Sequence, residues 1–481
     1  MKIARYSLGL CLVFISGLVQ AQTTTGSDGW TLEECLNYAI ENNEQLKISQ
    51  FDEEIAQAQI GQIRAQGLPQ VSGGLGYTYN LALQQQIVQD FLSPAIGGVL
   101  LGLGSISPQQ FEGITAAADT TFFGLAFGTT HSGFASVQLN QLIFDGTYFV
   151  GLQAARTFRE LSAVQTDRTR EQVIEGVTKA YYGVLVNEER LTLLERNLER
   201  LETLVSDTEK LYEEGFAEKI DVSRLKVNRN NLFTEFQKLK DFVRISNDLL
   251  KFQMGMPVSE PLTLSLSLAQ ITIADEEDMA SEEFNFSQRT DYMINQVNQE
   301  LVALDLKNVR AGYLPSLRGN FQAGYNNGAN NFLEVEEGDD AGPGLFTNDW
   351  LEFANVGVTL SIPIFDGLLK ANQAQEKKWQ AEQLKQQQKL LENNITLEIQ
   401  QAQINYQNNM ASLEWQKENM ELAREVITVA EAKYREGLGS NLEVVEANTS
   451  LKEAQTNYYA AVYDLLISQI ELRKALGQLN N

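Results

Sequence analysis

The chain has 481 residues and a formal net charge of −26, with 63 acidic and 37 basic side chains. This acidic balance argues against a nucleic-acid-binding protein, which needs a basic face. With one histidine (His131) and two cysteines (Cys11 and Cys35), the sequence offers neither a histidine triad nor a cysteine–histidine zinc cage. We therefore expect that the protein is not an enzyme and binds neither a cofactor nor a metal. The alternative is an enzyme whose site is made of carboxylates alone.

The first residues have the pattern of a cleaved secretory signal peptide. Lys2 and Arg5 precede a short apolar stretch, and small residues end the segment 1–21. Cys11 comes too early in this stretch for a lipoprotein signal, so we expect no lipid anchor. Beyond this segment no apolar run reaches the roughly 20 residues of a membrane-spanning helix. A membrane crossing would therefore use a β-barrel.

The first half of the mature chain contains two segments in which apolar and polar residues alternate. This period of two predicts β-strands at about 71–83 and 133–144. Between them lies a long segment, 84–132, which is rich in glycine and apolar residues and is predicted to be a loop.

A very long helix is predicted after the second strand. Apolar or aromatic residues recur there every seven positions: Val177, Val184, Leu191, Leu198, Val205 and Tyr212. A heptad repeat of this length implies coiled-coil packing. Residues 150–214 would form a helix roughly 97 Å long. An ordinary helical bundle is the alternative, but a compact domain has no need of such a helix.

The second half of the chain repeats this organisation. Alternating segments predict strands at about 316–327 and 353–364, with an acidic loop at 327–352 between them. A second long helix has heptad positions at Tyr406, Leu413, Met420, Ile427 and Tyr434. We therefore predict two structural repeats, 22–256 and 286–481, joined by a connector at 257–285.

The strands alone leave two interpretations open. A soluble antiparallel sheet with one wet face has the same alternation as a membrane-spanning sheet. Four strands cannot close a barrel, because even small barrels have eight, so the membrane interpretation requires several copies of the chain.

The order and duplication of several short motifs carry a more specific resemblance. The pattern Tyr-x-x-Gly at Tyr212 and Gly215, followed by Asp221, recurs at Tyr434 and Gly437. Leu-Pro precedes the first strand of each half, and Phe-Asp-Gly follows the second. From residue 32 to 479 the chain resembles the TolC-like outer-membrane efflux proteins, also called outer membrane factors.

The resemblance implies an α+β membrane protein that acts as a homotrimer. Three chains would build a twelve-stranded transmembrane β-barrel in the outer-membrane lipid of a Gram-negative cell, above a periplasmic tunnel of long coiled-coil helices. The channel would be the passive exit duct of a tripartite efflux or type I secretion system. Its partners would be a periplasmic adaptor and an inner-membrane pump of RND or ABC type.

The resemblance also implies roles for particular residues. Glu443 and Glu446 lie three residues apart on one helical face and would form a cation-selective gate. Leu438 would constrict the tip, since the family's basic latch residue is here Gly439. The turns with Tyr212, Gly215, Asp221, Tyr434 and Gly437 would contact the adaptor. A solvated helix face and two ordinary helical turns are the alternatives.

Two other classes of protein compete with this interpretation. A periplasmic coiled-coil adaptor without a pore would share the signal peptide and the heptads, but it would lack the four alternating strands. An enzyme that uses carboxylates, such as a glycosidase, would need a compact domain with a pocket. No segment of the sequence has the pattern of such a domain.

Overall fold

The computed structural model describes residues 29–119, 121–265, 268, 284–336 and 342–479. The predicted signal peptide, most of the predicted connector and the centre of the acidic loop lie outside these residues. The helices are α1 (Leu32–Asn42), α2 (Glu44–Gln66), α3 (Leu92–Gly102), α4 (Pro108–Ala118), α5 (Gly146–Glu213), α6 (Lys219–Met254), α8 (Thr290–Ala311), α9 (Leu369–Arg435) and α10 (Asn441–Ala475). A short 3₁₀ helix, η2 (Phe286–Gln288), precedes α8.

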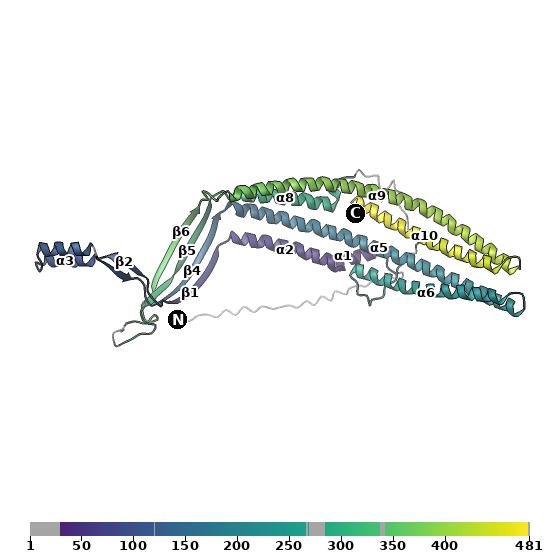
Figure 1. Ribbon diagram of the computed structural model, residues 1–481, viewed down its shortest axis with the longest axis horizontal. Coiled ribbons are helices and arrows are strands. Elements are labelled where there is room, and N and C mark those ends of the chain that lie inside the picture. Colours follow the sequence, from purple (N-terminus) through teal and green to yellow (C-terminus); the bar gives the residue numbers. More distant parts are fainter. Residues whose placement is uncertain (1–28, 120, 266–267, 269–283, 337–341, 480–481) are drawn as a thin grey trace, which may run out of the picture. The chain divides into compact units, whose positions relative to one another are not determined.

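The strands form two antiparallel sheets (Figure 1). They are β1 (Gln70–Tyr79), β2 (Gln85–Gln89), β3 (Phe122–Ala126), β4 (His131–Phe144), β5 (Ser316–Ala329) and β6 (Leu351–Ser361). The larger sheet has the order β1-β4-β5-β6, and β2 pairs only with β3. These helices and strands make an α+β fold, in agreement with the predicted class.

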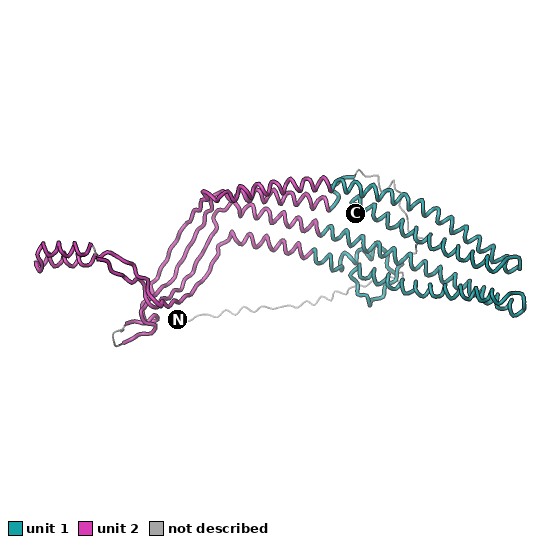
Figure 2. The backbone as a smooth tube through the Cα atoms, in the orientation of Figure 1, with its two compact units in different colours: residues 1–49, 166–290, 391–481 teal, residues 50–165, 291–390 magenta. Residues whose placement is uncertain are grey.

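The chain divides into two compact units, coloured separately in Figure 2. Unit 1 takes residues 1–49, 166–290 and 391–481, whereas unit 2 takes residues 50–165 and 291–390. Each unit therefore combines segments from both predicted repeats. Unit 1 contains the ends of the long helices and their returning partners, and unit 2 contains both sheets.

The heptads explain the cores of unit 1. Heptad side chains of α5, α6, α9 and α10 are buried, among them Val177, Val184, Leu225, Tyr406, Ile427, Val444, Leu451 and Leu465. Each fully buried aliphatic side chain of this kind contributes about 1.5–3 kcal/mol. Narrow apolar seams between helices thus hold unit 1 together, as in a coiled coil.

The Asp-Gly motifs mark the starts of the two longest helices. The Asp145 carboxylate accepts hydrogen bonds from the Thr147 N–H (2.9 Å) and hydroxyl (2.6 Å) where α5 begins. Asp366 likewise accepts from the Lys370 N–H (3.2 Å) at the start of α9. In each case a carboxylate satisfies a free donor of the first helical turn.

The strands differ most from their predicted bounds at two ends. β1 ends at Tyr79 rather than near residue 83, and β6 ends at Ser361 rather than near residue 364. Pro363 explains the second difference, because proline has no N–H to donate to a sheet.

The predicted loop at 84–132 is the clearest error of the sequence analysis. It contains the strands β2 and β3 and the helices α3 and α4. The start of α4 has a recognisable signal, since Ser107 caps it and Pro108 follows at the first helical position.

Candidate functional site

The two turns predicted for the tip have the same backbone. Gly215 after α5 has φ +84°, and Gly437 after α9 has φ +73°. The next N–H donates across the turn in both cases, from Phe216 to the Leu211 carbonyl (2.7 Å) and from Leu438 to the Lys433 carbonyl (2.8 Å). Glycine adopts the left-handed conformation without strain, so it ends both helices in the same way.

The helix after each turn is capped by a different group. Ser440 Oγ accepts a hydrogen bond from the Glu443 N–H (3.3 Å) at the start of α10. At the start of α6 the Asp221 carboxylate accepts from the Glu218 N–H (3.2 Å). The Asp221 side chain, predicted to contact an adaptor, therefore also has a local structural role. The Ser-x-x-Glu spacing at Ser440 is a capping signal that could have been found in the sequence.

Polar contacts join the two helical hairpins near these turns. The Tyr434 hydroxyl donates to Thr208 Oγ1 (3.3 Å), and Asn441 Nδ2 donates to the Asp221 carbonyl (3.3 Å). Tyr434 is half-buried, whereas Tyr212, the equivalent residue of the other turn, is exposed. Tyr434 thus packs within the chain and presents less surface than Tyr212 to a partner.

Arg200 on α5 also links the two helical hairpins, at a point further from the turns. Its guanidinium lies 3.4 Å from a Glu431 carboxylate oxygen and donates to Asn448 Oδ1 (2.8 Å). Burial lowers the pKa of the Arg200 guanidinium, and the charge of Glu431 acts in the opposite direction. Neither Arg200 nor its partners were singled out in the sequence, because they belong to three different helices.

The predicted gate residues lie on the surface of unit 1. Glu443 and Glu446 are both exposed, whereas Val444 between them is buried against the core of the two hairpins. In the part of the chain that the structure describes, neither glutamate side chain has an ion pair. The two carboxylates therefore share an outward-facing side of α10 and carry their charges into the surroundings.

Leu438 and Asp221 differ in exposure. Leu438 is 82% exposed beside Gly437, which is unusual for a leucine. Asp221, the equivalent of Glu443 in the first turn, is half-buried, and Arg224 occupies the place equivalent to Glu446. The two turns thus share a backbone but present different charges.

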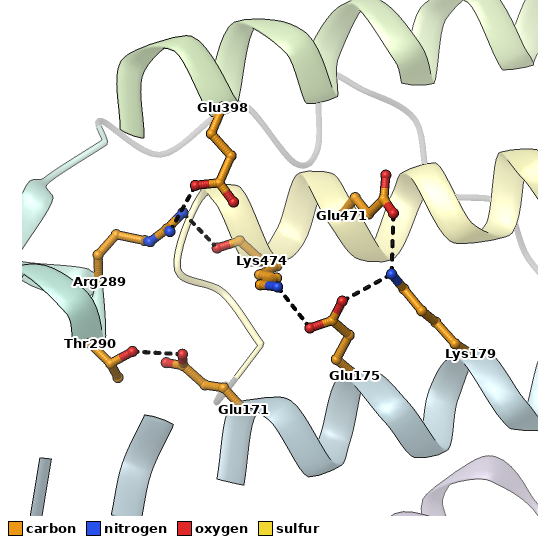
Figure 3. A network of polar contacts seen from close by, with 8 residues as sticks. All are labelled: Glu171, Glu175, Lys179, Arg289, Thr290, Glu398, Glu471 and Lys474. Atoms are coloured by element: carbon orange, nitrogen blue, oxygen red, sulfur yellow. Dashed lines mark hydrogen bonds and ion pairs between the residues drawn. The ribbon is translucent and has the colours of Figure 1, made fainter. Parts of the chain in front are cut away.

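A network of charged residues elsewhere in unit 1 was not predicted (Figure 3). Glu175 on α5 pairs with Lys179 (2.9 Å) and with Lys474 on α10 (2.9 Å). Lys179 also pairs with Glu471 (3.2 Å). Burial by itself would raise the pKa of the Glu175 carboxyl, but the bonds and charges of the two lysines outweigh it and hold that pKa below its usual value.

The same network continues to the start of α8, as Figure 3 shows. Arg289 pairs with Glu398 on α9 (2.9 Å) and donates to the Ala475 carbonyl at the end of α10 (3.0 Å). Thr290 donates to the Glu171 carboxylate on α5 (2.8 Å). Pairs between residues so far apart in the chain leave no signal in the sequence. Their arrangement links α5, α9 and α10 to the first residue of α8 within unit 1.

The four-stranded sheet of unit 2 has one apolar and one polar face. The register aligns Leu139 with Val71 and Phe321, and Phe321 with Val356. The apolar residues that alternate along the four strands, such as Leu75, Val137, Tyr325 and Val358, therefore share one face, and most of them are exposed. A bulge at Ile143 brings Phe144 opposite Leu317, also on this face.

The other face of the sheet is hollowed and polar at the end next to the helices, whereas Phe134, Leu351 and Phe353 share this face toward the other end. A cavity of about 1310 Å³ in unit 2 is lined by Gln70, Gln138, Asn140, Arg318 and Asn320, together with residues of the neighbouring helices. These five residues alternate with the apolar set along their strands. The sheet thus separates an apolar side from a side suited to water. None of the helices in the described residues is both long and apolar enough to cross a membrane.

Comparison with known proteins identifies the family. A model of the family "outer membrane efflux protein" matches residues 35–231 and 296–478, which is well over half of the chain. The chain belongs to the outer membrane efflux protein family. The family is one of efflux channels and not of enzymes, in agreement with the predicted resemblance.

Individual relatives agree with this assignment. The outer membrane protein TolC of Escherichia coli K12 is 20% identical over 100% of this chain and 87% of its own length. TolC of Vibrio cholerae is 20% identical over 72% of this chain and 77% of its own length. The CmeC outer membrane channel of Campylobacter jejuni has the same fold, with a TM-score of 0.69 at 15% identity over 99% of this chain and 94% of that chain.

Proposed function

We propose that this protein is the outer-membrane exit duct of a tripartite efflux or type I secretion system. Three copies would form one passive channel, and an inner-membrane pump of RND or ABC type would supply the energy through a periplasmic adaptor. Membership in the outer membrane efflux protein family supports this assignment. The signal peptide and the absence of a lipid anchor remain predictions from residues 1–21, which lie outside the described residues.

The exposed apolar face of the four-stranded sheet is the observation that carries the proposal. On β6 alone, Val356 is 82% exposed, and Val358 and Leu360 follow it on the same face. Soluble monomers rarely expose a continuous apolar surface of this kind. Strands of about ten residues with one apolar and one polar face are the pattern of an outer-membrane barrel. Lipid would cover the apolar face, and the polar hollow would line the duct.

The edges of this sheet support closure by identical copies. Within the described residues, β1 and β6 each pair on one side only. Neighbouring strands within the chain are antiparallel throughout. In a closed ring, β6 of one copy would therefore be antiparallel to β1 of the next. A head-to-tail contact of this kind generates a ring, and three copies would give twelve strands without a free edge.

Exposed apolar side chains on the helices also support neighbouring copies. On α9, Trp415, Leu422 and Val429 recur every seven residues and are exposed. On α6, Phe242 and Leu249 are exposed at the same interval. Because heptad stripes pack against other helices, we assign these stripes to contacts between subunits of the tunnel wall.

The acidic gate is the finer part of the proposal. Three copies would place Glu443 and Glu446 of each chain around the narrow periplasmic entrance. Rings of carboxylates attract cations and repel anions, so the entrance would be cation-selective. The exposure of both side chains supports this role. The turns at Gly215 and Gly437, with Leu438 beside the second, would meet the adaptor.

An adjacent pair of arginine substitutions tests the membrane assignment. Val356 lies on the apolar face in the middle of β6, and Asn355 lies beside it on the polar face. Both side chains are exposed in the chain. Val356→Arg is expected to reduce membrane insertion by about 2–4 kcal/mol, whereas Asn355→Arg is expected to insert normally.

The readout is release of a small dye from vesicles that contain the purified protein, with no energy source added. Wild type and Asn355→Arg should release the dye, and Val356→Arg should not. Equal behaviour of the two variants would contradict a lipid-covered apolar face. Failure of the wild type to release dye would contradict the channel and favour a periplasmic adaptor without a pore.

A further inference from the structure

The segment between β1 and β4 carries an apolar surface that the proposed duct does not explain. On α3 and at its C-cap, Leu92, Ile96, Val99 and Leu103 are spaced by four, three and four residues. Their side chains are 45%, 57%, 63% and 73% exposed. This spacing places all four on one side of the helix, as in the seam of a coiled coil. We name these four residues the α3 stripe.

The stripe is not the side of α3 that packs within the chain. Gly97 is buried, and a Cβ at this position would lie 3.1 Å from Phe111 and 3.4 Å from Ile114 on α4. α4 therefore covers the side of α3 that contains Gly97. The α3 stripe lies on another side and has no apolar cover among the described residues.

The segment is connected to the end of the large sheet by backbone hydrogen bonds. The Asn80 N–H donates to the Thr130 carbonyl (2.8 Å), just beyond the paired ends of β1 and β4. The Phe127 N–H then donates to the Gln84 carbonyl (3.0 Å), next to the paired strands β2 and β3. In a trimer, three copies of α3 and α4 would thus be tethered at the same end of the barrel.

The lack of charged residues around α3 favours a second copy of the same segment as the partner that covers the α3 stripe. Residues 91–111 contain no charged side chain, although the whole chain has a net charge of −26. Identical copies can therefore approach here without repulsion. Residues 80–132 contain no lysine or arginine. A helix that lies on a lipid surface normally carries such residues to meet anionic headgroups, so a membrane surface suits this segment poorly.

We propose that the α3 stripes of three subunits pack against one another as a parallel three-helix bundle at the outer end of the duct. This inference rests on the proposed trimer. An isolated helix of 11 residues is too short to be stable in water, and pairing of free copies would be weak. Attachment to one barrel raises the effective concentration of the three helices and makes their association intramolecular. The bundle narrows the outer opening of the channel.

Cysteine crosslinking in the full-length protein tests this arrangement. Val99→Cys places a thiol in the α3 stripe, and Leu103→Cys provides a second position there. Gln109→Cys, exposed on α4, is the matched control outside the stripe. Wild type serves as the blank for the native cysteines. Cys11 lies in the predicted signal peptide, and Cys35 is buried, with a thiol pKa raised to about 12 by burial and by Glu34. The protein is treated in membranes with a short bismaleimide, and the number of copies in each particle is measured separately by native mass spectrometry.

The expected result is a trimer in which both stripe variants form covalently linked subunits and Gln109→Cys gives no more than wild type. A trimer in which neither stripe variant exceeds the control would overturn the bundle and leave the duct standing. Protection of the stripe cysteines by lipid would also overturn it, in favour of a membrane surface. A particle with another number of copies would overturn the bundle together with the proposed trimer.

Discussion

The two helical turns of unit 1 have the same backbone and different chemistry. Gly215 and Gly437 adopt the same left-handed conformation, and carbonyls at equivalent positions accept the hydrogen bonds that close the two turns. The first turn is followed by Asp221 and Arg224, whereas the second is followed by Glu443 and Glu446. The Asp221 carboxylate caps α6 and is therefore held in a local hydrogen bond. Ser440 caps α10 instead, so the Glu443 carboxylate stays exposed.

This difference separates what the fold requires from what the proposed gate would use. Both hairpins need a glycine and a cap. Where the chain reverses direction, one helix ends and the next begins, and their terminal carbonyl and N–H groups must find hydrogen-bond partners. At two equivalent positions after the turn, the second hairpin has the exposed Glu443 and Glu446, whereas the first has the half-buried Asp221 and the exposed Arg224. We therefore expect substitutions in the shared features to affect both hairpins alike, and charge substitutions to distinguish them.

The largest effect is expected in the core that both hairpins share. Leu225 is 0% exposed and packs in the cluster that also contains Val444 and Leu451. Leu225→Ala should destabilise this end of unit 1 by about 2–5 kcal/mol, because it leaves a cavity. Hydrogen exchange of the α6 and α10 amides measures the loss. Leu438→Ala, on an exposed residue, should change stability by less than about 0.5 kcal/mol. Equal protection in the two variants would show that the hairpins do not share one core.

The next largest effect on stability is expected from substitution of the two turn glycines, Gly215 and Gly437. A Cβ at Gly215 or Gly437 would meet nothing within 4 Å, so only the backbone conformation opposes it. Gly215→Ala and Gly437→Ala should each destabilise the turn by about 1–2 kcal/mol. Gly151→Ala is the control, since Gly151 lies inside α5 with equally open space, and alanine there should stabilise the helix by about 0.5–1 kcal/mol. Thermal unfolding compares the three variants, and a loss at only one turn would contradict their equivalence.

Removing a cap should have a similar or smaller effect. Ser440→Ala leaves the Glu443 N–H without its acceptor and should destabilise the start of α10 by about 1 kcal/mol. Asp221→Ala should do the same at the start of α6, because its carboxylate accepts from Glu218. Ser440→Asp restores an acceptor and should keep the stability of wild type. Faster exchange of the first α10 amides in Ser440→Asp than in wild type would argue against this role of the cap.

The smallest effect on stability, and the sharpest on function, is expected from Arg224. Arg224→Glu makes the charges of the first turn similar to those of the second. Since Arg224 is exposed, stability should change by less than about 0.5 kcal/mol. The added carboxylates should increase the preference of the channel for cations, measured as a shift in reversal potential under a salt gradient. An unchanged reversal potential would show that the first turn does not face the ion pathway.

Local patterns in the sequence accounted for the turns, the heptads and the four strands of the large sheet. Each has a fixed period or a fixed requirement, such as the left-handed glycine at Gly215 or the alternation around Val356. The segment 84–132 escaped detection because runs of adjacent apolar residues, such as Val99, Leu100 and Leu101, obscure the helical spacing of the α3 stripe. The packing of α3 against Phe111 on α4 appears only in the structure. The network around Glu175 escaped for another reason. It joins residues far apart in the chain, as Lys179 and Glu471 are, and neither partner is unusual by itself.

The most direct measurement is planar-bilayer conductance of the purified protein, comparing wild type with Glu443→Ala/Glu446→Ala. The account predicts stable, cation-selective channels for wild type and channels without that selectivity for the double variant. Equal selectivity in both proteins would remove the gate from Glu443 and Glu446 while keeping the duct. A wild-type protein that forms no channel would contradict the central claim that this chain builds an outer-membrane exit duct.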